Sequence, residues 1–279
     1  MKSTDNDRKR QKLEALAEQA KAGSKEAVEE ILIEIQDMVF NLSLRMLGTI
    51  HDAEDASQEI LIKVMTHLSG FRGESAFTTW VFSIATNHLL NYKKHLFANA
   101  PLSFEFYGED IVNGKTEDIP DMSGGVDKNL LEEELKMSCT NVMLQCLDGE
   151  SRCIYILGTM FKADSRIAGE ILGMTPEAYR QKLSRIRRKV AEFLKEYCGL
   201  AGGRCSCKKR VNYAIATHRI NPQRLEYQAL STDGMQAMEQ VDDCSVVFSE
   251  LPMYGVTQTT KEMLSGFLNS ELCTYIKNA

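Results

Sequence analysis

The sequence has little of several features that define specialised protein classes. Its 279 residues include only five prolines and one tryptophan, while 43% are hydrophobic. This composition excludes a collagen-like chain and a wholly disordered one. No apolar run approaches the ~20 residues of a membrane-spanning helix, and the first thirty residues lack the apolar stretch of a secretory signal. We therefore expect a cytoplasmic protein with no membrane segment, long enough for more than one domain.

Signatures of catalysis are also missing. The chain has no Gly-rich phosphate loop, no nucleophile elbow and no paired-carboxylate motif. Its five histidines form no pair at the spacing of metal ligands on a helix. The sequence therefore predicts that the protein is not an enzyme.

An excess of positive charge is lacking as well, because the formal net charge is −6. The charge is unevenly distributed: residues 1–94 carry −2, residues 95–136 carry −7, residues 137–197 carry +3 and the rest is neutral. Within the third segment, residues 177–196 hold seven basic side chains and three acidic ones. Such a local basic surface can contact DNA phosphates. The rest of the chain is negatively charged and would repel DNA. We expect the isolated protein to bind DNA weakly.

Apolar residues at steps of three and four predict three helices near the N-terminus. These helices cover residues 26–47, 52–68 and 75–94. Gly48 is expected to end the first helix, Asp52 to cap the second and Ser75 to cap the third. Three helices with short connections predict a compact all-α bundle over residues 1–94.

Helical periodicity disappears over residues 95–130. This stretch is acidic, contains two of the five prolines and includes a Ser-Gly-Gly run. It is too long for a loop inside one compact domain. We therefore expect a flexible acidic linker.

Residues 131–197 contain the strongest local pattern, which predicts a helix-turn-helix. A helix over 165–172 is followed by Gly173 for a left-handed turn, Thr175 as N-cap and Pro176 at the first position of a second helix. The residues expected to form the shared core are Ile167, Ala168, Ile171, Met174, Tyr179, Leu183, Ile186 and Val190.

The outward face of the second helix is basic, and such a helix can enter the major groove of DNA. Arginine and glutamine have the donors for base contacts, and the other cations suit phosphates. The outward residues are Arg180, Gln181, Lys182, Ser184, Arg185 and Arg188. A solvated charged helix in an ordinary helical hairpin is the alternative interpretation.

Two parts of the chain together resemble the sigma-70 family of transcription initiation factors, most closely the small extracytoplasmic-function (ECF) type. The segment with the strings DAEDASQE and FRGESAFTTW resembles region two, and the segment with TPEAYRQKLSRIRRK resembles region four. The two resemblances cover roughly residues 27–197 in the family's order. They imply two small helical domains joined by the acidic linker, which in the family threads through a channel of the polymerase.

The resemblance implies a site for core RNA polymerase on the second predicted helix. The acidic and polar residues that match the family's docking face are Asp52, Glu54, Asp55, Gln58 and Glu59. Short side chains of one charge sign can steer a basic partner. Helix capping and dipole compensation are an alternative that explains Asp52 and Glu54 well but Gln58 and Glu59 poorly.

The resemblance also implies that residues 71–94 melt the promoter and read its minus-ten element, while the outward face of the last helix reads the minus-thirty-five element. The residues that match the minus-ten contacts are Phe71, Arg72, Ser75, Ala76, Phe77, Trp80, Asn87, Lys93 and Lys94. Exposed bases of melted DNA can stack on aromatic rings. Phe77 and Trp80 also fall on the apolar stripe, so packing in the core remains an alternative for them.

Residues 198–279 form a cysteine-containing C-terminal extension, which we expect to be regulatory. Cys198, Cys205, Cys207 and His218 are candidate ligands for zinc. A thiol redox sensor and plain free thiols are the alternatives. The remaining cysteines are expected to be small core residues.

The sequence thus predicts an all-α sigma factor that directs core RNA polymerase to promoter DNA, with no cofactor required. An anti-sigma factor is a further possible partner. The alternative is an autonomous helix-turn-helix transcription regulator with a metal- or redox-sensing tail. Binding of duplex DNA without polymerase would distinguish the regulator from the sigma factor.

Overall fold

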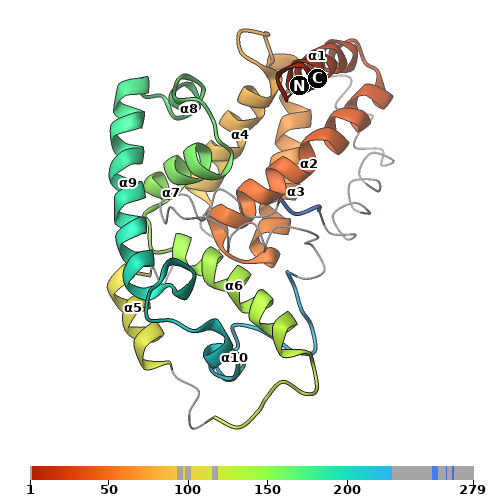
Figure 1. The fold of residues 1–279 in the computed structure, drawn as a ribbon. Helices are drawn as coiled ribbons and strands as arrows, with labels where there is room; N and C mark the ends of the chain where they lie inside the picture. Colours follow the sequence, from red (N-terminus) through yellow and green to blue (C-terminus); the bar gives the residue numbers. More distant parts are fainter. Residues whose placement is uncertain are drawn as a thin grey trace.

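The computed structural model describes residues 2–92, 97, 102–114, 119–227, 253–256, 262 and 266. All regular secondary structure within these residues is helical, as Figure 1 shows. No helix in this part of the chain is long and apolar enough to cross a membrane. The all-α fold predicted from the sequence is therefore confirmed.

Four helices form the N-terminal bundle at the top of Figure 1. They are α1 (Lys2–Lys21), α2 (Lys25–Leu47), α3 (Ile50–Thr66) and α4 (Phe77–Asn91). Helix α2 ends at Gly48, whose φ of +89° lies in the left-handed region that glycine adopts readily. Helix α1 was not expected from the sequence, because most of its residues are polar and its apolar residues form only a narrow stripe. That stripe, Leu13, Leu16, Ala17 and Ala20, is buried.

Two of the three predicted helix caps are wrong. Thr49, not Asp52, caps α3: its side-chain oxygen accepts a hydrogen bond from the Asp52 amide at 3.1 Å and donates one to the Asp52 carboxylate at 2.6 Å. Ala76 occupies the N-cap position of α4 and makes no side-chain cap. Ser75 therefore lies one position too early to cap that helix.

The expected flexible linker contains a helix, α5 (Phe104–Asn113). Ser103 caps it, and its Phe104 and Tyr107 rings lie 5.0 and 5.9 Å from the ring of Phe193 in α9. Gly108 lets the two helices approach, because a Cβ there would lie 2.6 Å from the ring of Tyr197. The prediction of an unstructured stretch is wrong over these residues, since ten residues are too few to show a clear period.

The second half of the chain begins with helices α6 (Lys128–Leu144) and α7 (Gly149–Tyr155) and the π-helical turn η3 (Ile156–Met160). The helix-turn-helix follows as α8 (Ser165–Leu172) and α9 (Pro176–Tyr197). A short turn, η4 (Gly199–Ala201), then leads to α10 (Cys207–Ala216) at the lower end of Figure 1.

One hydrophobic core runs through both halves, from Leu13 of α1 to Leu194 of α9. At the junction, Arg152 of α7 donates to the Met46 carbonyl of α2, and Arg45 of α2 donates to the Asn141 side chain of α6 at 3.1 Å. The two small domains expected from the sequence are therefore packed into one body. Sequence periodicity shows that a helix has an apolar face, but it does not show which partner covers it.

Helix α10 packs on the N-terminal half of α6 in a second, smaller core. A buried ionic cluster joins α10 to α5: Asp110 accepts from Arg210 at 2.8 Å, from Tyr213 at 2.7 Å and from both guanidinium nitrogens of Arg219 at 2.6 and 2.7 Å. Burial alone would raise the pKa of Asp110, but these hydrogen bonds, led by the one from Arg219, hold that pKa below its usual range.

Candidate functional site

The helix-turn-helix has the local geometry that its sequence predicts. Gly173 adopts a φ of +65°, and Thr175 accepts a hydrogen bond from the Ala178 amide at 3.2 Å to cap α9. Gly169 is a further requirement that the sequence analysis missed, because a Cβ there would lie 2.6 Å from the Met174 carbonyl oxygen. A small residue four positions before a glycine turn is the signal that could have found it.

Helix α9 is amphipathic as predicted. Tyr179 and Val190 are buried, and the Tyr179 hydroxyl donates to the Ile154 carbonyl at 2.9 Å. All six residues predicted to face DNA are exposed: Arg180, Gln181, Lys182, Ser184, Arg185 and Arg188. Ile167 is the exception in the predicted core, since 42% of it is exposed. It lies on the outer side of α8, which is only eight residues long.

The exposed cations of α9 make local contacts that DNA phosphates could replace. Arg180 donates to Glu177 at 2.7 Å and to Ser165 at 3.0 Å, and Lys182 pairs with Glu150. Exposed pairs of this kind contribute little to stability. Arg187 differs, because it donates to the Gly158 carbonyl at 2.9 Å and packs the helix onto η3.

The acidic face predicted to bind polymerase lies on α3. Asp55 is exposed, and Glu54, Gln58 and Glu59 are half-buried. Asp52 is 9% exposed and hydrogen-bonded to Thr49, so it shapes the start of the helix. The surface available to a partner is therefore narrower than the sequence implied.

Three packed aromatic rings join the loop of residues 71–76 to the first turn of α4. Phe71, Phe77 and Trp80 have ring centroids 5.1 to 5.6 Å apart. Phe71 and Phe77 are only 3% and 1% exposed, so in this structure they pack in the core, and Trp80 is half-buried against them. Phe71 and Phe77 cannot stack on bases while they are buried in this way, whereas the role of Trp80 stays a prediction. Arg72 is exposed, and Ser75 and Ala76 are half-buried.

Asn87 of α4 is exposed at a cleft between α3 and α4. Glu59, Lys63 and Tyr92 also line this cleft, and the Lys63 ammonium lies 2.7 Å from a ring nitrogen of His88. The cleft thus offers amide, cationic and aromatic groups, which suit a nucleotide base and its phosphate. Lys93 and Lys94, the other predicted minus-ten contacts, lie outside the described residues.

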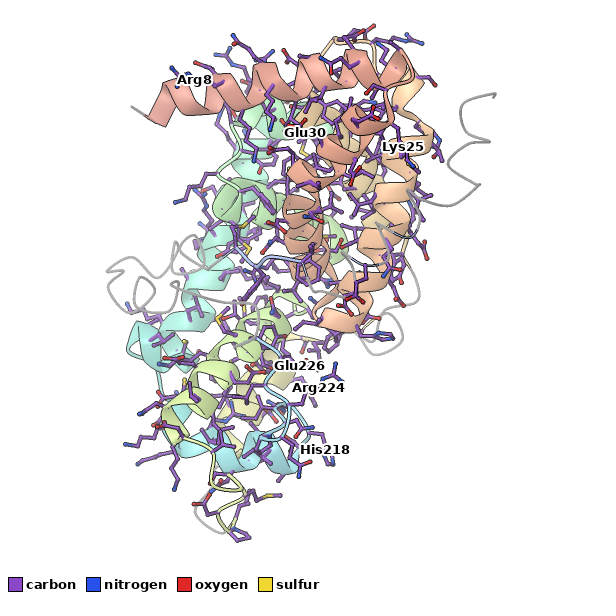
Figure 2. The ribbon with its side chains drawn as sticks, turned by 90° about the vertical axis from the view of Figure 1, so that its right-hand side faces the viewer. Arg8, Lys25, Glu30, His218, Arg224 and Glu226 are labelled. Carbon is purple, nitrogen blue, oxygen red and sulfur yellow. The ribbon has the colours of Figure 1, made fainter. Side chains whose placement is uncertain are left out.

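The structure does not assemble the predicted zinc ligands. His218 follows the C-terminal end of α10, and Cys207 begins that helix. Ten helical residues span ~15 Å, too far for one metal ion. Figure 2 shows His218 in the lower part of the molecule, far from Arg8 at the top and below Arg224 and Glu226. Within the part of the chain that the structure describes, no group of three or more His, Cys, Asp or Glu side chains is arranged to hold a metal ion.

The cysteines lie instead around a pocket between α5, α6 and the start of α10. Cys139, Cys198, Cys205 and Cys207 line it together with Tyr107. A hydrogen bond with Cys207, helped by the charge of Arg210, lowers the pKa of Cys205 below its usual value. Cys146 and Cys153 are buried in the main core as predicted. Cys244 and Cys273 lie outside the described residues.

Comparison with known proteins matches residues 32–96 to the Sigma-70 region 2 family. The ECF RNA polymerase sigma factor SigW of Bacillus subtilis is 38% identical over 69 residues, which are 25% of this chain and 37% of that protein. The RNA polymerase sigma-H factor of Pseudomonas aeruginosa is 35% identical over 77 residues, which are 28% of this chain and 40% of that one. The ECF RNA polymerase sigma-E factor of Escherichia coli K12 is 35% identical over 79 residues, 28% of this chain and 41% of the other.

A solved structure titled "Structure of CnrH in complex with the cytosolic domain of CnrY" aligns with 65% of this chain and 96% of its own, at 19% identity and a TM-score of 0.47. The matched segment spans about two fifths of the length of these curated relatives. The helices α2 to α4 thus form a sigma-70 region 2 domain. The family match covers residues 32–96 of this chain, and the relatives that it resembles there include ECF RNA polymerase sigma factors.

Proposed function

We propose that this protein is a transcription initiation factor that binds core RNA polymerase and directs it to promoters. The observation that carries the proposal is the presence of two separate exposed surfaces on one chain. One is the acidic face of α3, within the residues that match region 2, and the other is the basic face of α9 in a helix-turn-helix. A factor that joins an enzyme to DNA needs both surfaces and no catalytic centre of its own.

In this proposal the acidic face of α3 attracts a basic surface of the polymerase, because complementary charge raises the rate of association. The cleft at Asn87 takes a base of the minus-ten element after the strands separate. The outward residues of α9 read the minus-thirty-five element, Arg185 and Gln181 by hydrogen bonds to base edges and Lys182 through phosphates. The overall charge of −6 keeps the free protein from binding DNA by itself.

In vitro transcription with core polymerase on a promoter library tests the proposal. We expect start-site-specific transcripts only when the protein is present. Arg185→Ala should reduce output from promoters with a minus-thirty-five element by about tenfold, since a base contact contributes ~1–3 kcal/mol. Lys209→Ala on α10 removes the same charge from an exposed site outside the helix-turn-helix and serves as the matched control.

A charge reversal tests the polymerase surface. Asp55→Lys should weaken binding to core polymerase, while Glu29→Lys, an equal change at an exposed site on α2, should not. Absence of specific transcripts from every promoter would refute the proposal. Protection of duplex DNA by the protein alone would favour an autonomous regulator instead.

A further inference from the structure

A short segment of the C-terminal extension lies on α2, more than two hundred residues away along the chain. Residues 253–256 run past Asn41, which is fully buried. The Asn41 side chain accepts from the Tyr254 amide at 2.9 Å and donates to the Tyr254 carbonyl at 2.7 Å. Asp37 accepts from the Val256 amide at 2.9 Å. An amide side chain that pairs with both backbone groups of one residue recognises an extended peptide by its main chain.

The side chains of the segment are enclosed as well. Tyr254 is 1% exposed and Val256 is 5% exposed. The Arg45 guanidinium lies 4.9 Å from the centre of the Tyr254 ring, at the range of a cation–π contact. The ring of Tyr227, from the beginning of the extension, lies 6.2 Å from that of Tyr254. The neighbouring Met253 is 54% exposed.

The contacts of Tyr254 reach the junction between the two halves of the molecule. Arg45, which stacks on the Tyr254 ring, also donates to Asn141 of α6 at 3.1 Å. On the other side of the junction, α4 packs on α8, and the rings of Phe82 and Phe161 meet edge to face with centroids 5.1 Å apart. The segment therefore lies where it can hold α2 of the region 2 domain next to α6 of the second half.

This closed arrangement conflicts with the proposed contacts to promoter DNA. The minus-ten and minus-thirty-five elements lie about 25 base pairs apart, or ~85 Å along a duplex at 3.4 Å per base pair. Helix α4 reads the first element and α9 the second in the proposed function, yet both belong to one packed core here. The two halves must separate before both elements can be bound.

We propose that the surface of α2 formed by Asp37, Asn41 and Arg45 is a binding site for an extended peptide, occupied by residues 253–256 of the same chain, and that this occupancy keeps the protein closed. The role in promoter binding rests on the proposed function, whereas the peptide site does not. Because the segment is tethered, its high effective concentration keeps the site filled although the described part of the segment is short. A partner that binds α2 or α3 better in the open form would release it.

Substitutions in the full-length chain test the proposal. Tyr254→Ala removes the buried ring and should increase the radius of gyration in small-angle X-ray scattering. It should also raise the affinity for core polymerase, by about tenfold if closure costs ~1.4 kcal/mol. Asp37→Ala removes one acceptor at an exposed site and should shift both quantities in the same direction by less. Met253→Ala is the matched control and should behave as the wild type.

A synthetic peptide with the sequence of residues 251–258, LPMYGVTQ, should return the Tyr254→Ala protein to the compact form, and the same peptide with alanine for tyrosine should not. The proposal is overturned if Tyr254→Ala matches Met253→Ala in compactness and affinity, or if the peptide has no effect. Should Tyr254→Ala fail to fold, equal behaviour of Asp37→Ala and Met253→Ala would overturn it. If the variants become less compact but no specific transcript forms with core polymerase, the proposed function is contradicted and the peptide site is not.

Discussion

Two junctions hold this molecule together, and they use opposite chemistry. At the junction between α5 and α10, one carboxylate, Asp110, receives hydrogen bonds from two arginines and a tyrosine. At the junction between α2 and α7, Arg152 donates to backbone carbonyls, among them Leu144 at 3.0 Å, Leu147 at 2.8 Å and Met46. The first junction is ionic, and the second relies on peptide dipoles.

This difference in chemistry indicates which of the two junctions is harder to separate. Separating a buried carboxylate from its arginine partners leaves both charges unpaired. This destabilises the folded protein by several kcal/mol. Carbonyl oxygens freed at the second junction can be hydrated, and burial already lowers the pKa of Arg152 to about 10. The α10 part of the extension is thus tied firmly to α5, while the contact between α2 and α7 is the easier one to open.

The largest effect is expected from breaking the ionic junction. Asp110→Asn leaves Arg210 and Arg219 without their carboxylate and should lower the free energy of unfolding by about 3–5 kcal/mol. The measurement is urea denaturation at pH 7, with hydrogen exchange of the α10 amides. Glu109→Gln, on the exposed side of the same helix, is the control and should change neither. Equal stability of the two variants would mean that the ionic cluster does not hold the extension.

A smaller effect is expected at the carbonyl junction. Arg152→Met keeps the length of the side chain but removes its hydrogen bonds, and should lower the free energy of unfolding by about 2–3 kcal/mol. The exposed Arg166→Met on α8 controls for loss of charge. We expect faster hydrogen exchange in α2 and α7 before any change in α10. If hydrogen exchange accelerates equally in α2, α7 and α10, the two junctions do not open independently.

Acid should weaken the ionic junction selectively. Because the pKa of Asp110 is lower in the folded than in the unfolded protein, its contribution is complete at neutral pH. That contribution falls as the pH drops below about 4 and is lost below the folded pKa. In denaturation curves between pH 7 and 3, the difference between wild type and Asp110→Asn should narrow. A constant difference would show that the carboxylate charge is not what matters.

The smallest effect is expected at Gln145, next to the carbonyl junction. Its amide donates to the Arg45 and Asn141 carbonyls at 3.4 and 3.3 Å, and its own buried carbonyl oxygen has no hydrogen-bond partner in the described structure. Gln145→Met removes weak bonds together with an unsatisfied acceptor, so stability should change by less than about 1 kcal/mol. A loss as large as that of Arg152→Met would show that the amide is part of the same network.

Local chemistry explains which features could be predicted before the structure. Gly173, Thr175 and Pro176 act within one turn of chain, so their roles in the helix-turn-helix were correct. Ser75 and Asp52 were assigned to caps that Ala76 and Thr49 occupy, because a cap depends on backbone angles at one residue. The polymerase and DNA contacts remain predictions, apart from the exposure or burial of their side chains.

The sequence by itself determined the amphipathic helices of residues 26–94, the helix-turn-helix, the resemblance to region 2 and the basic face of α9, because periodicity, turn residues and charge act over a few residues. Only the tertiary structure decided what covers the apolar faces: one core in place of two domains, a helix in the linker, and Tyr254 against Arg45 and Asn41. These contacts join residues up to 213 positions apart. The sequence pattern fixes the chemistry of each face but not its partner, since any apolar or polar surface of matching shape could bury it.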